Sequence, residues 1–120
     1  MSEKIFDRVS RFFKDLSISS KAQKELRRYD QIIQFNITDE GLFFIRISNG
    51  EAIAERGEIE KFDFLNVLLI KTDTNTTNAL LEKDLTLGEA LFQGKIDIYG
   101  NIVKEYIIAW LSQLLRIKKD

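Results

Sequence analysis

The chain has 120 residues, the size of one domain that can bury a real hydrophobic core. Its formal net charge is −1, so a nucleic-acid partner would receive no electrostatic support. It contains no cysteine and no histidine, which excludes disulfides, thiolate metal sites and imidazole or thiol catalysis. We therefore expect no cofactor and no metal.

The first clear pattern is an amphipathic helix near the N-terminus. Apolar residues recur there at helical spacing, which predicts a helix that covers a core; a mobile lid or a helix that touches membranes stays open as an alternative. Residues 1–19 are interpreted as an extra N-terminal helix of a single domain over residues 1–120. The apolar stripe consists of Ile5, Phe6, Val9, Phe12, Phe13 and Leu16.

The sequence shows no targeting or membrane-spanning signal. The N-terminal segment carries charges of both signs and lacks the apolar run of a signal peptide. The apolar region at residues 102–117 is too short to span a bilayer and is interrupted by Lys104, Glu105, Gln113 and Arg116. We therefore expect a cytoplasmic protein.

A short basic helix follows the first one. Residues 20–23 have the pattern of a capping box, with Ser20 as the expected N-cap and the helix continuing to about Arg28. Its cations form a solvated face or, in the minority interpretation, an anion-binding site. They are Lys21, Lys24, Arg27 and Arg28.

The middle of the chain predicts a sheet. Ile33, Phe35 and Ile37 alternate with polar residues, and Asn49-Gly50 is a strong signal for a tight hairpin. Residues 64–72 are almost all apolar, which is typical of a central strand that is covered on both faces. A charged connection at residues 57–63 precedes it. Four strands are predicted, at residues 31–38, 42–48, 51–56 and 64–72.

The last third alternates helices with one more strand. Asp73 or Thr74 caps a short helix, and Thr86 opens a second through a capping box. Gly94 suits the left-handed end of that helix, a strand runs to Gly100, and Asn101 is the expected N-cap of the last helix. The apolar face of this helix consists of Val103, Tyr106, Ile107, Trp110, Leu111, Leu114 and Ile117.

This order of elements, with the segments ISNGE and FQGKIDIYGN, resembles the sterol carrier protein family, also called the nonspecific lipid-transfer domain. The resemblance covers about residues 21–117, and its most specific part is residues 92–95 followed by a strand and Gly100-Asn101. Lys83 and Leu87 depart from the family, because they stand near positions where it often has a glycine and a proline.

The resemblance implies an α+β fold, with a five-stranded, mostly antiparallel sheet, helices covering one face and an apolar tunnel between the layers. It implies a protein that binds and transfers a lipid without catalysis, the lipid being a fatty acid, an acyl-CoA, an isoprenoid or a sterol-like molecule. The implied partner is that ligand, with transient membrane contact and no nucleic acid. The oligomeric state is left open.

The resemblance also implies site residues. Those near the motif and on the last helix would line the tunnel, and four sheet residues are added although the pattern does not show which strand face points inward. Each could equally fill an ordinary core. The basic pair Arg27 and Arg28 would receive a carboxylate or phosphate head group. The proposed lipid contacts are Phe35, Phe44, Ile45, Leu69, Leu91, Phe92, Gln93, Ile107, Trp110, Leu111 and Leu114.

Two other functions are weighed. An accessory module would use the same fold to bind a protein partner in lipid or quinone metabolism, and an undocked first helix would favour it. A hydrolase without histidine or cysteine would use paired acids or a metal, and Glu58, Glu60 and Asp63 do cluster. They lie in a charged loop, where a solvated surface is the better explanation, so no enzyme is expected.

Overall fold

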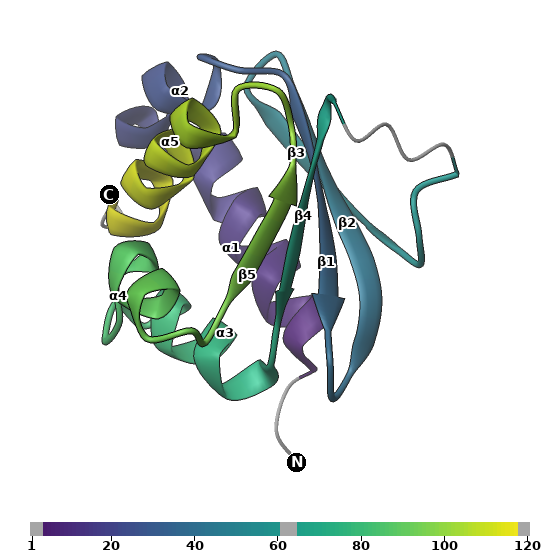
Figure 1. Cartoon of the computed structure of the whole chain (residues 1–120). Helices are drawn as coiled ribbons and strands as arrows, with labels where there is room; N and C mark the ends of the chain where they lie inside the picture. Colours follow the sequence, from purple (N-terminus) through teal and green to yellow (C-terminus); the bar gives the residue numbers. More distant parts are fainter. Residues whose placement is uncertain (1–3, 61–64, 118–120) are drawn as a thin grey trace.

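A sheet of five strands forms one layer of the computed structural model, which describes residues 4–60 and 65–117, and helices cover one face of it (Figure 1). The predicted α+β class with one helical layer is confirmed. In chain order the elements are α1 (Ile5–Ile18), α2 (Ser20–Leu26), β1 (Gln31–Ile37), β2 (Gly41–Ser48), β3 (Glu51–Arg56), β4 (Val67–Thr72), α3 (Thr74–Leu81), α4 (Leu87–Phe92), β5 (Asp97–Gly100) and α5 (Lys104–Arg116).

The sheet has the strand order β3-β2-β1-β4-β5. β1, β2 and β3 form an antiparallel meander, and β5 pairs antiparallel with β4. β4 pairs parallel with β1, so the sheet is mixed but mostly antiparallel, as expected. The connection after β3 must therefore cross from one edge of the sheet to the far side of β1.

Strand alternation decides which residues face the helices. Phe35 lies opposite Phe43 on β2 and Ile70 on β4, and all three belong to the buried core. The neighbouring row on the other face contains Phe44 and Leu69, which lie opposite Gln34 in the register. Placing Phe44 and Leu69 in the layer between sheet and helices was therefore wrong, because successive side chains of a strand point to opposite faces.

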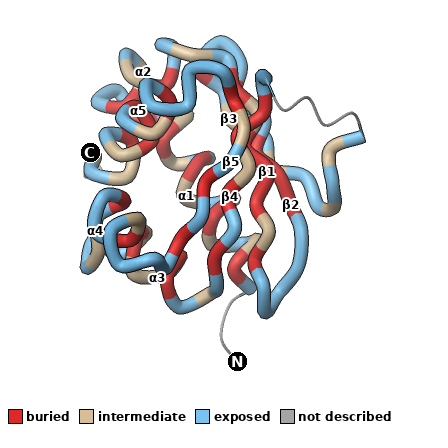
Figure 2. Tube along the Cα trace, in the orientation of Figure 1, coloured by how far each residue is buried: buried red, intermediate tan, exposed pale blue. Residues whose placement is uncertain are grey.

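Helix α1 is part of the core. Its residues Ile5, Val9, Phe13 and Leu16 are buried, and the helix packs against β3 at the edge of the sheet (Figure 2). This placement agrees with the prediction of a helix that covers a core. It does not support the alternatives of a mobile lid or a membrane-touching helix, since these would leave the stripe exposed.

Two of the predicted helix caps are present. The carboxylate of Asp73 accepts a hydrogen bond from the backbone of Thr76, and Thr86 and Glu89 form a complete capping box on α4. Gly94 has a φ of 70°, the left-handed conformation expected after a helix.

Two other predicted caps are wrong. α2 begins at Ser20 itself and its N-cap is Ser19, while Gln23 bonds to the backbone oxygens of Ser17 and Gly50 instead of closing a box. α5 begins at Lys104 rather than directly after Asn101. Asn101 instead has a φ of 62° and forms a local turn, in which its side chain accepts from the backbone of Val103.

Two features predicted from the sequence fall on residues that the structure does not describe. The predicted start of the fourth strand at Phe64 and the acid Asp63 lie outside the described residues. The described part of that strand begins at Val67.

Candidate functional site

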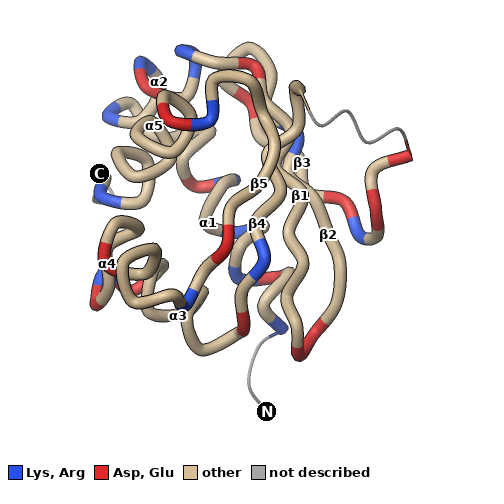
Figure 3. Tube along the Cα trace, in the orientation of Figure 1, with Lys and Arg blue, Asp and Glu red and all other residues tan. Residues whose placement is uncertain are grey.

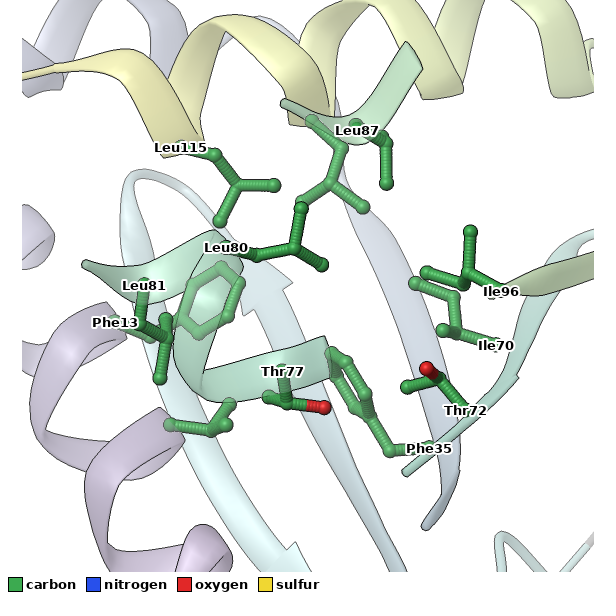
Figure 4. A pocket seen from close by; sticks show the side chains of 12 residues that line it. Phe13, Phe35, Ile70, Thr72, Thr77, Leu80, Leu81, Leu87, Ile96 and Leu115 are labelled. Atoms are coloured by element: carbon green, nitrogen blue, oxygen red, sulfur yellow. The ribbon is translucent and has the colours of Figure 1, made fainter. Parts of the chain in front are cut away.

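A small apolar cavity lies between the sheet and the helices (Figure 4). Its volume is about 30 Å³, and a water molecule needs roughly 10–15 Å³ of such space. Pockets that hold small ligands usually measure about 300–1,000 Å³. The layer is therefore nearly filled by side chains here. The lining residues are Val9, Phe13, Phe35, Ile70, Thr72, Thr77, Leu80, Leu81, Leu87, Ile96, Leu111 and Leu115.

Six elements and one short connection bring these side chains together. α1 supplies Val9 and Phe13, and α3, α4 and α5 supply leucines. The sheet contributes Phe35 of β1 and Ile70 of β4, which are paired in register, and Ile96 lies just before β5. The cavity thus lies where segments from both ends of the sequence converge.

The two hydroxyl groups on the wall are already hydrogen-bonded. Thr72 Oγ1 donates to the carbonyl oxygen of Lys95 at 2.8 Å, and Thr77 Oγ1 donates to that of Asp73 at 2.9 Å. Each hydroxyl has a single proton to donate. The inner cavity therefore suits hydrocarbon and offers no donor for a polar head group.

A larger cavity adjoins the inner one. Its volume is about 280 Å³, close to the lower end of the roughly 300–1,000 Å³ of ligand pockets. Leu80, Leu87 and Leu115 line both cavities, so these three side chains separate the two spaces. The other residues that line the outer cavity are Lys83, Leu85, Thr86, Ser112 and Arg116.

The outer cavity carries two cations. Arg116 comes from the last turn of α5, and Lys83 comes from the connection between α3 and α4. The ammonium of Lys83 donates to the carbonyl oxygen of Leu115 at 2.8 Å, which ties this connection to the end of α5. Lys83 has a φ of 65°, a left-handed conformation that favours glycine.

The structure brings only some of the proposed lipid contacts to the inner cavity. Phe35 and Leu111 line it. Phe92 is 94% exposed and Gln93 is the exposed C-cap of α4, because the buried positions Leu87 and Ala90 place the inward stripe of this helix elsewhere. Leu91 is half-buried. Four others are buried in the core but do not line the cavity: Ile45, Ile107, Trp110 and Leu114.

The proposed head-group anchor is also placed elsewhere. Arg27 is exposed, bonds to Gln23 and lies against Gly50 of the β2–β3 hairpin. Arg28 follows α2, is exposed and pairs with Glu25 of that helix at 3.6 Å. Neither arginine is among the residues that line the two cavities.

Sequence reasoning missed Lys83 and Arg116 as cavity residues. The charged residues are spread over loops and the outer sides of helices, and the strands carry few of them (Figure 3). A pattern of charges therefore did not distinguish these two cations from the others. The departure at Lys83 from a position where the resembling family often has glycine was the one available signal.

The described residues show no cluster of side chains for metal binding. Among them, no group of three or more Asp or Glu side chains could hold a metal ion. The two acids with lowered pKa values are capping or turn residues: the backbone N–H of Thr86 lowers the pKa of Glu89, and that of Thr74 lowers the pKa of Asp39. Within the described ranges, no helix is long and apolar enough to cross a bilayer.

These elements form a two-layer α+β domain, with a mixed five-stranded sheet, one helical layer and a small apolar cavity between them. The sequence matches the SCP-2 sterol transfer family over residues 11–104. The chain therefore belongs to the SCP-2 sterol transfer family. No curated protein matches it.

Solved structures confirm the fold. The UbiJ-SCP2 ubiquinone synthesis protein has a TM-score of 0.69 at 8% identity, with 92% of each chain covered. Palmitated SCP2L2 from Aedes aegypti has a TM-score of 0.67 at 19% identity, with 98% of this chain and 99% of that chain covered. The sec-alkylsulfatase Pisa1 from Pseudomonas sp. has a TM-score of 0.67 at 17% identity; this chain covers only 16% of that enzyme and is itself 93% covered.

Proposed function

We propose that this protein binds a single-chain lipid between its sheet and its helices and carries it without chemical change. The observation that carries the proposal is the pair of adjoining cavities, an inner one with apolar walls and an outer one that is nearly ten times larger (about 280 Å³ against about 30 Å³). Burying each methylene of a tail contributes about 0.8 kcal/mol, so such walls can hold a chain without specific contacts.

Binding requires the inner cavity to expand. At about 30 Å³ it holds no alkyl chain, so the leucines between the two cavities must move when the tail enters. Leu87 is the best placed to do so, because it belongs to α4, a helix of only six residues. Only two residues of α4, Leu87 and Ala90, are buried. We therefore expect α4 to shift outward when lipid binds.

The first test measures lipid binding with and without a blocked outer cavity. The purified protein is stripped of lipid and titrated with a fluorescent fatty acid. Ser112→Trp fills the outer cavity from a half-buried position on α5. It should raise the dissociation constant about tenfold or more.

Gln113→Trp is the matched control. Gln113 is the next residue of the same helix, is exposed and does not line either cavity, so its binding should equal that of the natural protein. A stripped protein that takes up no fatty acid, or equal binding by both tryptophan variants, would contradict the proposal.

A second candidate function is an accessory module that binds a protein partner. A set of exposed apolar side chains at the start of α5 favours it: Ile102 is 76% exposed and Tyr106 68% exposed. The loop that carries Ile102 is held from inside, since its backbone N–H donates to the Leu65 oxygen at 2.7 Å and the buried Asn101 side chain donates to Gln31 at 2.8 Å. The docked α1 no longer supports this function.

The second candidate predicts a complex that depends on this loop. The tagged chain, purified from the cells that make it, would retain a stoichiometric partner that Ile102→Ser with Tyr106→Ser removes while fatty-acid binding persists. Phe92→Ser, which removes an exposed aromatic residue elsewhere, would leave the partner bound. Purification of the chain alone would count against this candidate.

A further inference from the structure

We infer that Lys83 and Arg116 bind the anionic head group of a single-chain lipid whose tail lies in the inner cavity. The inference rests on the proposed function and adds the class of ligand: an alkyl chain that ends in a carboxylate or phosphate, in preference to a neutral lipid. It places the head group in the outer cavity, at the end of α5, rather than at Arg27 and Arg28.

The inner cavity cannot provide the head-group site. Its walls are apolar except for Thr72 and Thr77, whose hydroxyl protons are already donated to backbone oxygens. An anion without a hydrogen-bond donor would lose its hydration there without compensation, which costs several kcal/mol or more for an ion. A bound anionic lipid must therefore keep its head outside the three leucines that divide the cavities.

The outer cavity provides the matching charge. Lys83 and Arg116 line it together with the hydroxyl-bearing Thr86 and Ser112. The bond from Lys83 to the Leu115 oxygen fixes the ammonium beside the leucine that both cavities share. A carboxylate there would form charge-assisted hydrogen bonds with both cations, and these are about twice as strong as neutral ones.

Among the described residues, the acids of this region do not line the cavity. Glu82 pairs with Arg8 at 3.3 Å, and Glu89 is engaged with Thr86 in the capping box of α4. Asp84 follows Lys83 in the chain and is exposed. The charged side chains that the described residues contribute to the outer cavity are therefore both positive, although the chain as a whole carries a net charge of −1.

The left-handed backbone at Lys83 allows a variant that distinguishes a role of this residue in folding from a role in ligand binding. A φ of 65° strains any residue with a side chain and is relaxed in glycine. Lys83→Gly therefore removes the cation and relieves strain at once. A role in folding alone predicts no change in ligand preference, whereas a role in binding predicts a weaker anion preference in a protein that is at least as stable.

The experiment compares ligands that share one tail and differ in the head. Laurate, dodecyl phosphate and dodecanol displace the uncharged dye Nile red from the full chain at mildly alkaline pH. We expect the natural protein to bind the better of the two anions about tenfold more tightly than dodecanol, as one or two charge-assisted bonds would give. The laurate to dodecyl phosphate ratio then tells a carboxylate head from a phosphate head.

Three variants locate the effect. Lys83→Met with Arg116→Met, and separately Lys83→Gly, should lose most of the preference for the anion over dodecanol. The control combines Lys95→Met with Lys104→Met, which removes the same charge from two exposed residues outside both cavities and should keep the preference. Thermal unfolding confirms that each variant is folded.

The outcomes separate this inference from the proposed function. Equal binding of dodecanol and both anions, or a preference that survives Lys83→Met with Arg116→Met, overturns the head-group site and leaves lipid binding intact. Failure of all three probes to displace the dye, dodecanol included, overturns the proposed function and the head-group site with it.

Discussion

Gln34 shows how one polar residue can organise the outer face of the sheet. It is buried on the side that faces away from the helices, next to Phe44 in the register. Its Nε2 donates to the oxygens of Phe43 at 3.0 Å and Gly57 at 3.1 Å, and its Oε1 accepts from the backbone of Ile59 at 2.8 Å. The side chain thereby fastens the chain that leaves β3 onto the sheet.

We predict that Gln34→Met lowers the free energy of unfolding by about 1–3 kcal/mol, the usual cost of leaving buried backbone groups unsatisfied. Chemical denaturation measures this change. Gln113→Met is the control, because the same replacement at an exposed position of α5 should change stability by less than about 0.5 kcal/mol. Equal effects of the two variants would show that the bonds of Gln34 contribute little.

Lys83 is a residue whose place in the candidate site could not be seen from the sequence. Its sequence environment is a charged turn between two short helices, where a lysine is unremarkable. Its left-handed φ and its bond to Leu115 become visible only once α3, α4 and α5 are placed together. This is why the sequence suggested Arg27 and Arg28, an adjacent basic pair, as the anchor.

At the scale of elements, the two faces of α1 make the role of that helix testable. Phe13 is 2% exposed and contacts the core, whereas Ile18 at the end of the same helix is 79% exposed. If α1 is core, Phe13→Ala should cost about 3–5 kcal/mol and Ile18→Ala less than about 0.5 kcal/mol. Urea unfolding distinguishes this from a detachable helix, for which both costs would be small.

The capping box of α4 predicts a pH dependence. The backbone N–H of Thr86 lowers the pKa of Glu89 below its ordinary value of 4.5, so the folded protein favours the ionised carboxylate. This stabilisation is complete above pH 4.5 and disappears as the pH falls through the lowered value. The natural protein should therefore be more stable than Glu89→Gln near neutrality, and the difference should shrink in acid.

Thermal unfolding of both proteins across this pH range measures the effect. Glu105→Gln, an exposed acid in the first turn of α5, serves as the comparison for a charge without a capping box. A gap between natural protein and Glu89→Gln that stays constant on acidification would argue against the capping role of the carboxylate.

Elements defined by local chemistry were predictable from the sequence. Asp73, Thr86 and Gly94 have the expected roles at helix ends because each acts within a few residues of itself. Asn101 was misjudged because its side chain had two local uses, a helix cap or a turn, and contacts with Gln31 and Asn66 fix the turn.

The candidate site was less predictable, for a physical reason. β2 is apolar on both faces at its start, so alternation alone could not place Phe43 inside and Phe44 outside. Phe44 is nevertheless buried on the outer face, where Gln34 holds Gly57 and Ile59. Likewise Phe92 reads as apolar in sequence, yet its position on α4 points it to solvent.

At the scale of the whole molecule, the inner cavity lies between two sets of elements. Helix α1 and the meander β1–β3 form one set, while β4, β5 and the helices α3 to α5 form the other. The inner cavity is lined by both, with Val9, Phe13 and Phe35 from the first set and Ile70 and Leu87 among those from the second. A ligand at this position would hold the two sets together.

The parallel pairing of β1 with β4 affects the order in which parts of the molecule fold and the order in which they unfold locally. Short turns connect the paired strands of the meander. The pairing of Ile32 with Val67, in contrast, joins residues that are far apart in the sequence. Such non-local contacts close late and tend to open first. Amide hydrogen exchange should therefore be slowest in β1 and β2 and faster in α4 and β5.

Added laurate should slow exchange in α4 and β5 selectively, because it binds across the junction that opens. Uniform exchange over all strands, or uniform protection by the ligand, would contradict this picture. If it holds, the same late-forming contacts that delay folding also provide the opening motion by which a nearly filled interior admits a lipid.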